Sequence, residues 1–501
     1  MFVGECCMLT QKLKQYTEKF NADDQQRYAT QICNEDAFAF LRENMPRMEC
    51  PNQTLEEIYY FRWWVLRKHI KKTEDGYVIT EFLPNVPWSG KHNAIAAPFG
   101  HQVNETKWLK NARLILRDYI NYYLNGIGNL YDYSTWFADS VYEYCRHCND
   151  MAFAVESLPK LQTYFDTLQR QLTEDGLYYS YDGDDAMECS ISGGRSIAEA
   201  AYPGLRPTMN SYMAANAFAI AKIAEYAEKR ELAASYHQKG QLITEKMLAL
   251  LWDGSFFKAV HSTDRKTYPK LCELAPERNA RELLGYIPWM FNLPPAGYEK
   301  AFEDLLCPEG FATENGLTTA EQRHPRFMFD YPHSCLWNGY IWPFATTQTL
   351  VAVMNLLENY EQSILNWEHF YDMLLTYAKM HYHTLPNGKR ICWIDETQNP
   401  ITGQWSSRQV LESWNWPERK GGIERGRDYN HSGFCDLMLR GVLGIRVHQG
   451  KLKITPHIPA DWDYFMVENL WIDGECYRIC YDRTGRRYGS VGLVITKSTE
   501  I

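Results

Sequence analysis

Apolar residues recur with helical spacing along most of the chain, from about residue 34 to about residue 441. The segment 231–252, for example, repeats its apolar positions near the period of 3.6 residues that is typical of an amphipathic helix. Polar loops with Gly and Pro separate such segments, and the longer loops fall roughly after every second one. Comparable patterns predict further helices at 58–69, 105–124, 134–147, 157–172, 212–227, 279–291, 297–306, 342–359, 362–381 and 431–441.

Two helix starts are marked by local sequence. Thr54-Leu55-Glu56-Glu57 has the form of a capping box, which predicts that a helix begins there. Pro207 precedes the Ala-rich segment 212–227, and the first turn of a helix accepts proline. The alanines of that segment indicate close packing against neighbouring helices.

The last part of the chain has a different pattern. Short alternating runs bounded by Gly and Pro, at 447–456, 475–481 and 492–495, predict antiparallel strands. We therefore predict an all-α protein, an (α/α)6 barrel of residues 1–440, followed by a small β-rich domain of residues 441–501. An open helical array is the alternative. In the closed barrel, the long loops would lie at one end and form a cleft.

A length of 501 residues suits one large domain plus a small one, or two to three ordinary domains. Composition agrees with a soluble globular protein, since 45% of the residues are hydrophobic and 23% are charged. The net charge of −10 and the absence of a long Lys/Arg block argue against nucleic acid and anionic membranes as partners. The start of the sequence has no basic region followed by an apolar one, and no apolar run of about 18 residues occurs, so we expect no membrane segment. We predict a cytoplasmic protein whose 14 cysteines stay reduced.

Two acidic residues in aromatic surroundings are the main candidates for chemistry. Asp185 lies in a polar loop after several tyrosines, and Glu396 follows a tryptophan by three residues. A carboxyl near aromatic rings tends to keep its proton and a hydrated one tends to lose it, which is the contrast that glycoside hydrolysis needs. An ordinary Asp/Gly turn is the alternative interpretation of the first loop. Asp184 and Glu188 are rivals of Asp185, and Asp395 is a rival of Glu396.

Loops that combine aromatic and polar residues recur between the predicted helices. The segment 337–343 places an Asn-Gly turn between two tryptophans, and related mixtures occur at 88–93, 131–136 and 427–432. Aromatic faces stack on sugar rings, and amide, carboxylate or basic groups bind the hydroxyls, so we expect these loops to converge on one pocket. The residues expected to bind substrate are Trp88, Lys91, His92, Arg206, Asn210, Asp330, His333, Trp337, Asn338, Trp342 and His431.

Other chemistries find little support in the sequence. It contains no serine nucleophile elbow, no phosphate-binding loop and no zinc-protease helix. Cys145 and Cys148 have zinc-knuckle spacing but lack a second half, and Asp182, Asp184 and Glu188 are not part of a calcium-binding loop. We expect no metal and no cofactor.

The same segments resemble those of inverting (α/α)6 glycosidases, above all glycoside hydrolase family 63 (processing α-glucosidase) and the mannosylglycerate and glucosylglycerate hydrolases. Residues 183–185 match the Gly-x-Asp segment of those enzymes, and residues 337–343 match their Trp-Asn-Gly-x-x-Trp-Pro segment. Residues 396–403 match their Glu-Asn-Tyr-Asp/Asn-Pro-x-Thr-Gly segment at Glu, Asn, Pro, Thr and Gly. The resemblance covers about residues 50–440, with the segments in the same order.

This resemblance implies a mechanism. Asp185 would protonate the glycosidic oxygen, and Glu396 would activate a water that attacks and inverts the anomeric carbon, with the two carboxyls about 6.5–9.5 Å apart. The implied reaction is exo-acting hydrolysis of a small α-linked glycoside, such as an α-glucoside, without a cofactor. Two alternatives stay open: a non-catalytic carbohydrate-binding protein on the same barrel, and a sugar epimerase or lyase with a His or Tyr at the pocket floor.

Overall fold

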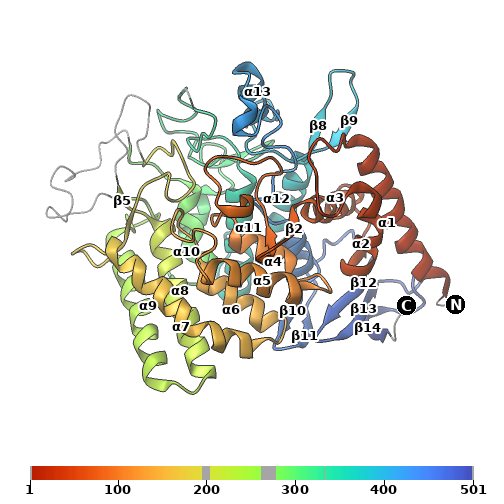
Figure 1. Cartoon of the computed structure of the whole chain (residues 1–501), viewed down its shortest axis with the longest axis horizontal. Coiled ribbons are helices and arrows are strands. Elements are labelled where there is room, and N and C mark those ends of the chain that lie inside the picture. The colour runs from red at the N-terminus through yellow and green to blue at the C-terminus, as the bar shows by residue number, and fades with distance from the viewer. Residues whose placement is uncertain (1–2, 194–202, 261–277, 332, 499–501) are drawn as a thin grey trace.

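Helices alternate along the chain between an outer and an inner ring and form an (α/α)6 barrel, as the sequence predicts (Figure 1). The computed structural model describes residues 3–193, 203–260, 278–331 and 333–498. The outer helices are α3 (Gln53–His69), α5 (Ala112–Leu124), α7 (Met151–Thr167), α9 (Arg230–Leu250), η5 (Glu299–Asp304) and α12 (Trp367–Met380). The inner helices are α4 (Phe99–Thr106), α6 (Phe137–His147), α8 (Pro207–Tyr226), α10 (Ile287–Met290), α11 (Pro343–Asn359) and the π-helical turn η7 (Leu437–Val442).

The two kinds of connection differ in length. Links from an inner helix to the next outer helix are short, such as 107–111 and 227–229, whereas links from an outer to an inner helix are long, such as 70–98 and 381–436. Because successive helices are antiparallel, all of the long links lie at the same end of the barrel. This end forms the upper part of the molecule in Figure 1, where the β8–β9 hairpin and α13 (Ser406–Ser413) project.

The long links hold the minor elements of the barrel. The 3₁₀ turns are η1 (Lys91–Asn93), η2 (Leu168–Gln171), η4 (Leu283–Tyr286) and η6 (Glu418–Lys420). The hairpin strands are β2 (Ile70–Thr73), β3 (Gly76–Ile79), β4 (Tyr179–Ser180), β5 (Gly204–Leu205), β6 (Ala312–Thr313), β7 (Gly316–Leu317), β8 (Tyr382–Thr384) and β9 (Arg390–Cys392).

The C-terminal residues form strands, as predicted, but their main sheet also takes a strand from the beginning of the chain. The sheet order is β1-β12-β13-β14, with antiparallel neighbours and with Met48 of β1 opposite Val467 of β12. This sheet lies beside α1 (Val3–Asp23) and α2 (Asn34–Asn44), away from the long links (Figure 1). The elements are β1 (Arg47–Glu49), β10 (Ile445–His448), β11 (Lys451–Ile454), β12 (Tyr464–Ile472), β13 (Glu475–Asp482) and β14 (Gly492–Ser498).

The Ala-rich helix α8 packs closely, as its composition predicts. Its alanines are buried, and Pro207 stands in its first turn. At the crossing with α9, a Cβ on Gly240 would lie 2.8 Å from the ring of Phe218, so a larger residue has no room there. The inner ring closes where Glu105 of α4 accepts backbone hydrogen bonds from Phe434, Cys435 and Asp436 at 2.9–3.1 Å.

Two local predictions are wrong. The helix expected to start at Thr54 begins at Gln53, and its cap is Asn52, whose side chain accepts from the Leu55 N–H. Glu57, the acidic residue of the predicted box, instead pairs with Lys19 of α1 (Val3–Asp23), which together with α2 (Asn34–Asn44) covers α3.

The helix predicted at 105–124 is two helices, because one of the short links of the barrel turns the chain between them at 107–111. No helix among the described residues has both the length and the apolar character needed to cross a membrane.

Candidate active site

A pocket of about 300 Å³ opens among the long links at one end of the barrel. None of its lining residues comes from the C-terminal strands. The structure brings together six of the residues predicted for the site, which are Trp88, His333, Trp337, Trp342, Glu396 and His431. The other lining residues include Glu81, Phe82, Tyr133, Glu188, Cys335, Phe344, Trp416, Lys420, Arg425 and Tyr429.

Glu396 is held in the pocket by a bidentate ion pair. Arg425 donates from Nε to Oε1 at 3.0 Å and from Nη2 to Oε2 at 2.7 Å, and both side chains are buried. The guanidinium lies over the rings of Trp88 and Trp416 at 5.4 and 5.0 Å from their centroids. Cation–π contacts and the bidentate bond together fix the orientation of this carboxylate.

Asp395, the rival of Glu396, points away from the pocket. Its carboxylate accepts hydrogen bonds from the Ser407 hydroxyl and the Glu396 N–H at 2.9 and 2.8 Å. A Cβ on Gly426 would lie 2.0 Å from the Asp395 carboxylate, so only glycine permits this approach of the chain. Of the two neighbours, Glu396 therefore faces the space that a ligand would occupy.

Burial raises the pKa of Glu396, and the ion pair with Arg425 opposes this increase. Cys335 donates to Glu396 Oε2 with an Sγ–O distance of 3.8 Å. Burial, together with the negative charges of Glu396 and Glu188, raises the pKa of the Cys335 thiol, so the thiol stays protonated. Cys335 is therefore close enough to Glu396 and Glu188 for both negative charges to act on its thiol.

Asp185, the expected acid, does not line the pocket. Arg206 donates from Nε to Asp185 Oδ2 at 2.7 Å, and both side chains are almost fully buried. The same guanidinium donates to the hydroxyls of Ser190 and Ser192, both at 3.1 Å. Arg206 was expected to bind substrate, but its described contacts hold this loop instead. Burial raises the pKa of Asp185, and Arg206 opposes the increase.

Glu188, three residues after Asp185, lines the pocket. Ala186 and Cys189 on either side of it have positive φ angles of 56° and 62°, a conformation that is uncommon for residues other than glycine. The Glu188 carbonyl accepts from the Trp337 N–H at 3.1 Å, and Asp182 accepts from the Cys189 N–H at 3.1 Å. These bonds hold a strained turn that presents Glu188 to the pocket.

A third carboxyl, Glu81, lies at the pocket wall. Tyr429 donates its hydroxyl to Glu81, and the Asn430 N–H donates to the Glu81 carbonyl at 3.0 Å. Burial raises the pKa of Glu81 to about 8, with the negative charges of Glu396 and Glu188 adding to the increase. The Tyr429 ring also contacts the His431 ring in a tilted arrangement, with a centroid distance of 3.8 Å. Burial holds the pKa of His431 well below 6.5, so its ring is neutral.

Replacement of Glu81 by Gln is expected to raise the melting temperature, and to raise it more in alkaline than in acidic solution. The pKa of Glu81 changes from 4.5 to about 8 on folding. Between these values the unfolded chain loses a proton that the folded chain keeps, so the stability that Glu81 contributes is complete below pH 4.5 and is lost as the pH rises through about 8. Glutamine has no such ionisation. Thermal unfolding of both proteins from about pH 5 to about pH 9 measures this difference, and a pH-independent difference would contradict it.

Trp337 and Trp342 stack on each other at one side of the pocket. Their centroids lie 4.5 Å apart at an angle of 20°, and Trp342 Nε1 donates to the Leu336 carbonyl at 2.9 Å. Asn338 between them does not line the pocket, because its amide donates to the Phe329 carbonyl at 2.7 Å. The Asn338 side chain therefore stabilises the neighbouring backbone, while the indoles of Trp337 and Trp342 give the pocket an aromatic surface.

Four other predicted binding residues also lie outside the pocket. Lys91 and His92 contact Asp75 in an exposed cluster, and Asp330 is exposed. Asn210 is buried. Its side-chain oxygen accepts from the Tyr178 N–H at 2.7 Å, and its side-chain amide donates to the Tyr178 carbonyl at 2.8 Å.

The exposed cluster is also the group among the described residues whose spacing could suit a metal. Ligand atoms of Glu74, Asp75 and His92 lie within 4.8 Å of one another. The Lys91 ammonium already pairs with both carboxylates, so the acidic groups of this cluster are engaged in salt bridges.

Sequence reasoning missed several pocket residues, above all Glu81, Cys335 and Arg425, whereas Tyr133 lies in the loop 131–136 that was expected to reach the pocket. Glu81 comes two residues after the strand β3 and before an aromatic-rich loop, which is a weak signal. Arg425 stands in a glycine-rich segment between Gly421 and Gly426, where close backbone approach could have indicated a site.

Comparison with known proteins shows the family of the chain. Residues 91–432 match the family model of the mannosylglycerate hydrolase MGH1-like glycoside hydrolase domain. Among curated proteins, no sequence matches the chain. A solved structure described as "Sialidase" is 34% identical, with a TM-score of 0.86 over 97% of this chain and 43% of that one.

Other solved structures share the fold at much lower identity. The GH78 family rhamnosidase of Bacillus SP. GL1 is 11% identical, with a TM-score of 0.52 over 87% of this chain and 40% of that one. The alpha-L-rhamnosidase from Dictyoglumus thermophilum is 12% identical, with a TM-score of 0.52 over 88% and 43% of the two chains. The present chain thus spans less than half the length of these proteins. Because the family model matches most of its length, the chain belongs to the MGH1-like glycoside hydrolases.

Proposed function

We propose that this protein is an inverting, exo-acting glycoside hydrolase that releases a terminal sugar from an α-linked glycoside. The observation that carries the proposal is that Glu188 and Glu396 line one small pocket, whereas Asp185 lies behind it in a buried ion pair. We therefore assign the general acid to Glu188 in place of Asp185. Membership in a hydrolase family favours this reaction over a sugar epimerase, a lyase or a non-catalytic binding protein.

In this mechanism, Glu188 gives its proton to the glycosidic oxygen as the bond to the leaving group breaks. Glu396, in the carboxylate form that Arg425 stabilises, takes a proton from a water that attacks the anomeric carbon from the opposite face. Two carboxyls about 6.5–9.5 Å apart leave room for that water, and the product has the inverted configuration. The neutral His431 and the indoles of Trp337 and Trp342 would contact the sugar ring.

The size of the pocket supports exo-action. A volume of about 300 Å³ is at the lower end of the range for small-molecule sites, and it suits one sugar ring with part of its leaving group. Hydrolysis of a panel of aryl α-glycosides, followed by proton NMR at early times, tests the reaction. We expect release of the β-anomer first, and early release of the α-anomer would contradict inversion.

A sialoside is a second candidate substrate, besides a neutral α-glucoside. The chain is 34% identical, over 97% of its length, to the protein described as "Sialidase". Lys420 lines the pocket, with its ammonium 5.2 Å from the ring centroid of Trp416, and the described residues provide it with no ion pair. An unpaired cation there suits a sugar that carries a carboxylate. Including an aryl α-sialoside in the panel separates the two candidates, and Lys420→Ala should raise KM for the sialoside only.

A further inference from the structure

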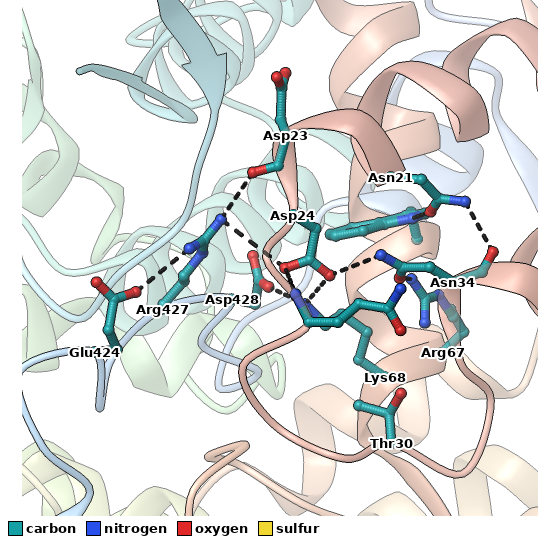
Figure 2. Close-up of polar contacts among 12 residues, drawn as sticks. Asn21, Asp23, Asp24, Thr30, Asn34, Arg67, Lys68, Glu424, Arg427 and Asp428 are labelled. Carbon is teal, nitrogen blue, oxygen red and sulfur yellow. Dashed lines mark hydrogen bonds and ion pairs between the residues drawn. The ribbon is translucent and has the colours of Figure 1, made fainter. Parts of the chain in front are cut away.

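A buried three-residue bridge joins the N-terminal part of the chain to the loop behind the active site. Lys68 Nζ, at the end of α3, lies 2.9 Å from Asp24 Oδ2 and 2.6 Å from Asp428 Oδ2 (Figure 2). The side chains of all three residues are at most 5% exposed. Two carboxylates therefore share one ammonium out of contact with solvent, where an ion pair is strong and an unpaired charge is costly.

Asp428 is held from several directions. Its φ angle is +56°, its N–H donates to the Ile394 carbonyl at 3.0 Å, and its carbonyl accepts from His69 Nε2 at 2.7 Å. Ile394 is two residues before the base Glu396. The backbone hydrogen bond between Asp428 and Ile394 thus joins the segment that carries Arg425 to the segment that carries Glu396. These two residues form the central ion pair of the pocket.

Two pocket residues follow Asp428 within three positions. Tyr429 hydrogen-bonds to Glu81 and contacts the ring of His431, and both Tyr429 and His431 line the pocket. A shift of the backbone at Asp428 would move these two side chains relative to Glu396. Misplacement by about 1 Å is enough to lower the rate of an enzyme about 100-fold.

The far side of the bridge is anchored in the segment between α1 and α2. Asp24 also accepts from Asn34 Nδ2 at 3.1 Å, and Arg427 donates to the Asp23 carbonyl at 3.1 Å (Figure 2). Arg67 holds the same segment through the Ile32 carbonyl and Asn34; its charge acts on Asp24 and Asp428 over a longer distance, but it forms no described hydrogen bond or ion pair with Asp428. This segment precedes the part of the chain that the family model matches.

We propose that the Asp24–Lys68–Asp428 bridge positions the active site, so that the N-terminal segment holds Tyr429 and His431 in place through Lys68. Lys68 is then a positioning residue, which acts on substrate only through Asp428 and the residues after it. The inference rests on the proposed hydrolase function for its kinetic test, but its structural test is independent of that function.

The kinetic test compares two neighbouring buried cations. Lys68→Met is expected to lower kcat/KM by about 10- to 100-fold, mainly through kcat, because it removes the described ion-pair partner of Asp428 and leaves Asp24 with Arg427 alone, at 3.9 Å. Arg67→Met removes the same amount of charge and also loosens the N-terminal segment, but it should keep kcat near the wild-type value. Equal losses in the two variants, after correction for the folded fraction, would overturn the proposal.

A charge-balanced variant distinguishes positioning from loss of folding. If the bridge acts through the charge at Asp428, the double variant Lys68→Met/Asp428→Asn should recover part of the activity that Lys68→Met loses, since fewer buried charges stay unpaired. The effects of the two substitutions should therefore be non-additive. Strict additivity would contradict coupling through Asp428.

Hydrogen–deuterium exchange tests the same bridge without any substrate. Backbone amides of residues 424–431 should exchange faster in Lys68→Met than in the wild type, and Arg67→Met should leave that segment unchanged. Unchanged exchange at 424–431 in Lys68→Met overturns the positioning role. If the wild type hydrolyses no glycoside, the proposed function fails, while the exchange result still decides whether the bridge holds the loop.

Discussion

Glu188→Gln is expected to lower kcat by about 10²- to 10⁴-fold on glycosides whose leaving group needs a proton. The reason is that Glu188 is the carboxyl of its loop that lines the pocket, so its loss removes the proton donor. On a dinitrophenyl glycoside, whose leaving group departs without a proton, the same variant should stay close to the wild type in the bond-breaking step. Comparing kcat on the two substrates therefore identifies the general acid, and an equal loss on both would contradict the assignment.

Asp184→Asn and Asp185→Asn are the matched controls in the same loop. Asp184 is half-buried, and its carboxylate accepts from the Tyr181 N–H at 3.1 Å, so we expect Asp184→Asn to keep kcat near the wild-type value. Asp185→Asn removes the charge that balances the buried Arg206, which typically costs about 3–5 kcal/mol of stability. We expect a lower melting temperature for this variant without the dependence on the leaving group. If Asp185→Asn shows that dependence and Glu188→Gln does not, Asp185 is the acid.

Glu396→Gln is expected to lower kcat by about 10²- to 10⁴-fold on every substrate, activated or not, because water needs a base whatever the leaving group is. Wild-type kcat/KM should rise with pH along a limb set by Glu396, at a pH above the ordinary carboxyl range because burial raises the pKa of this group. The variant should lose that limb. Steady-state kinetics from about pH 4 to about pH 8 measure both effects.

Asp395→Asn is the control for this second prediction. The Asp395 carboxylate accepts from the Ser407 hydroxyl and the Glu396 N–H, away from the pocket. We therefore expect Asp395→Asn to affect stability more than the pH profile of kcat/KM. A Glu396→Gln variant that keeps the acidic limb would show that another group is the base. Glu81 is then the carboxyl to test next, since it lines the same pocket.

The sequence predicted the fold well because the signals for helices and strands come from residues that are close together in the chain. Helical periodicity, Pro207 at a helix start and the alternating C-terminal runs depend on neighbouring residues, and the structure contains the corresponding elements. The errors arose where a distant partner intervened. Glu57 pairs with Lys19 in place of capping its own helix.

For the site, the sequence alone indicated which loops matter and that carboxyls, indoles and a histidine supply the chemistry. Six of the predicted residues line the pocket, and so does Glu188, named as a rival acid. Spacing could not decide which carboxyl of the loop 182–188 faces the pocket, because left-handed residues at Ala186 and Cys189 redirect the chain.

Tertiary structure decided the remaining features because they depend on residues that are far apart in the chain. Arg206, which follows the loop by many residues, takes Asp185 out of the pocket, and Lys68 reaches Asp428 across most of the sequence. Glu81 meets Tyr429 only because the ring of helices closes. Burial then sets the ionisation of these groups, and burial is a property of the closed barrel that no local pattern contains.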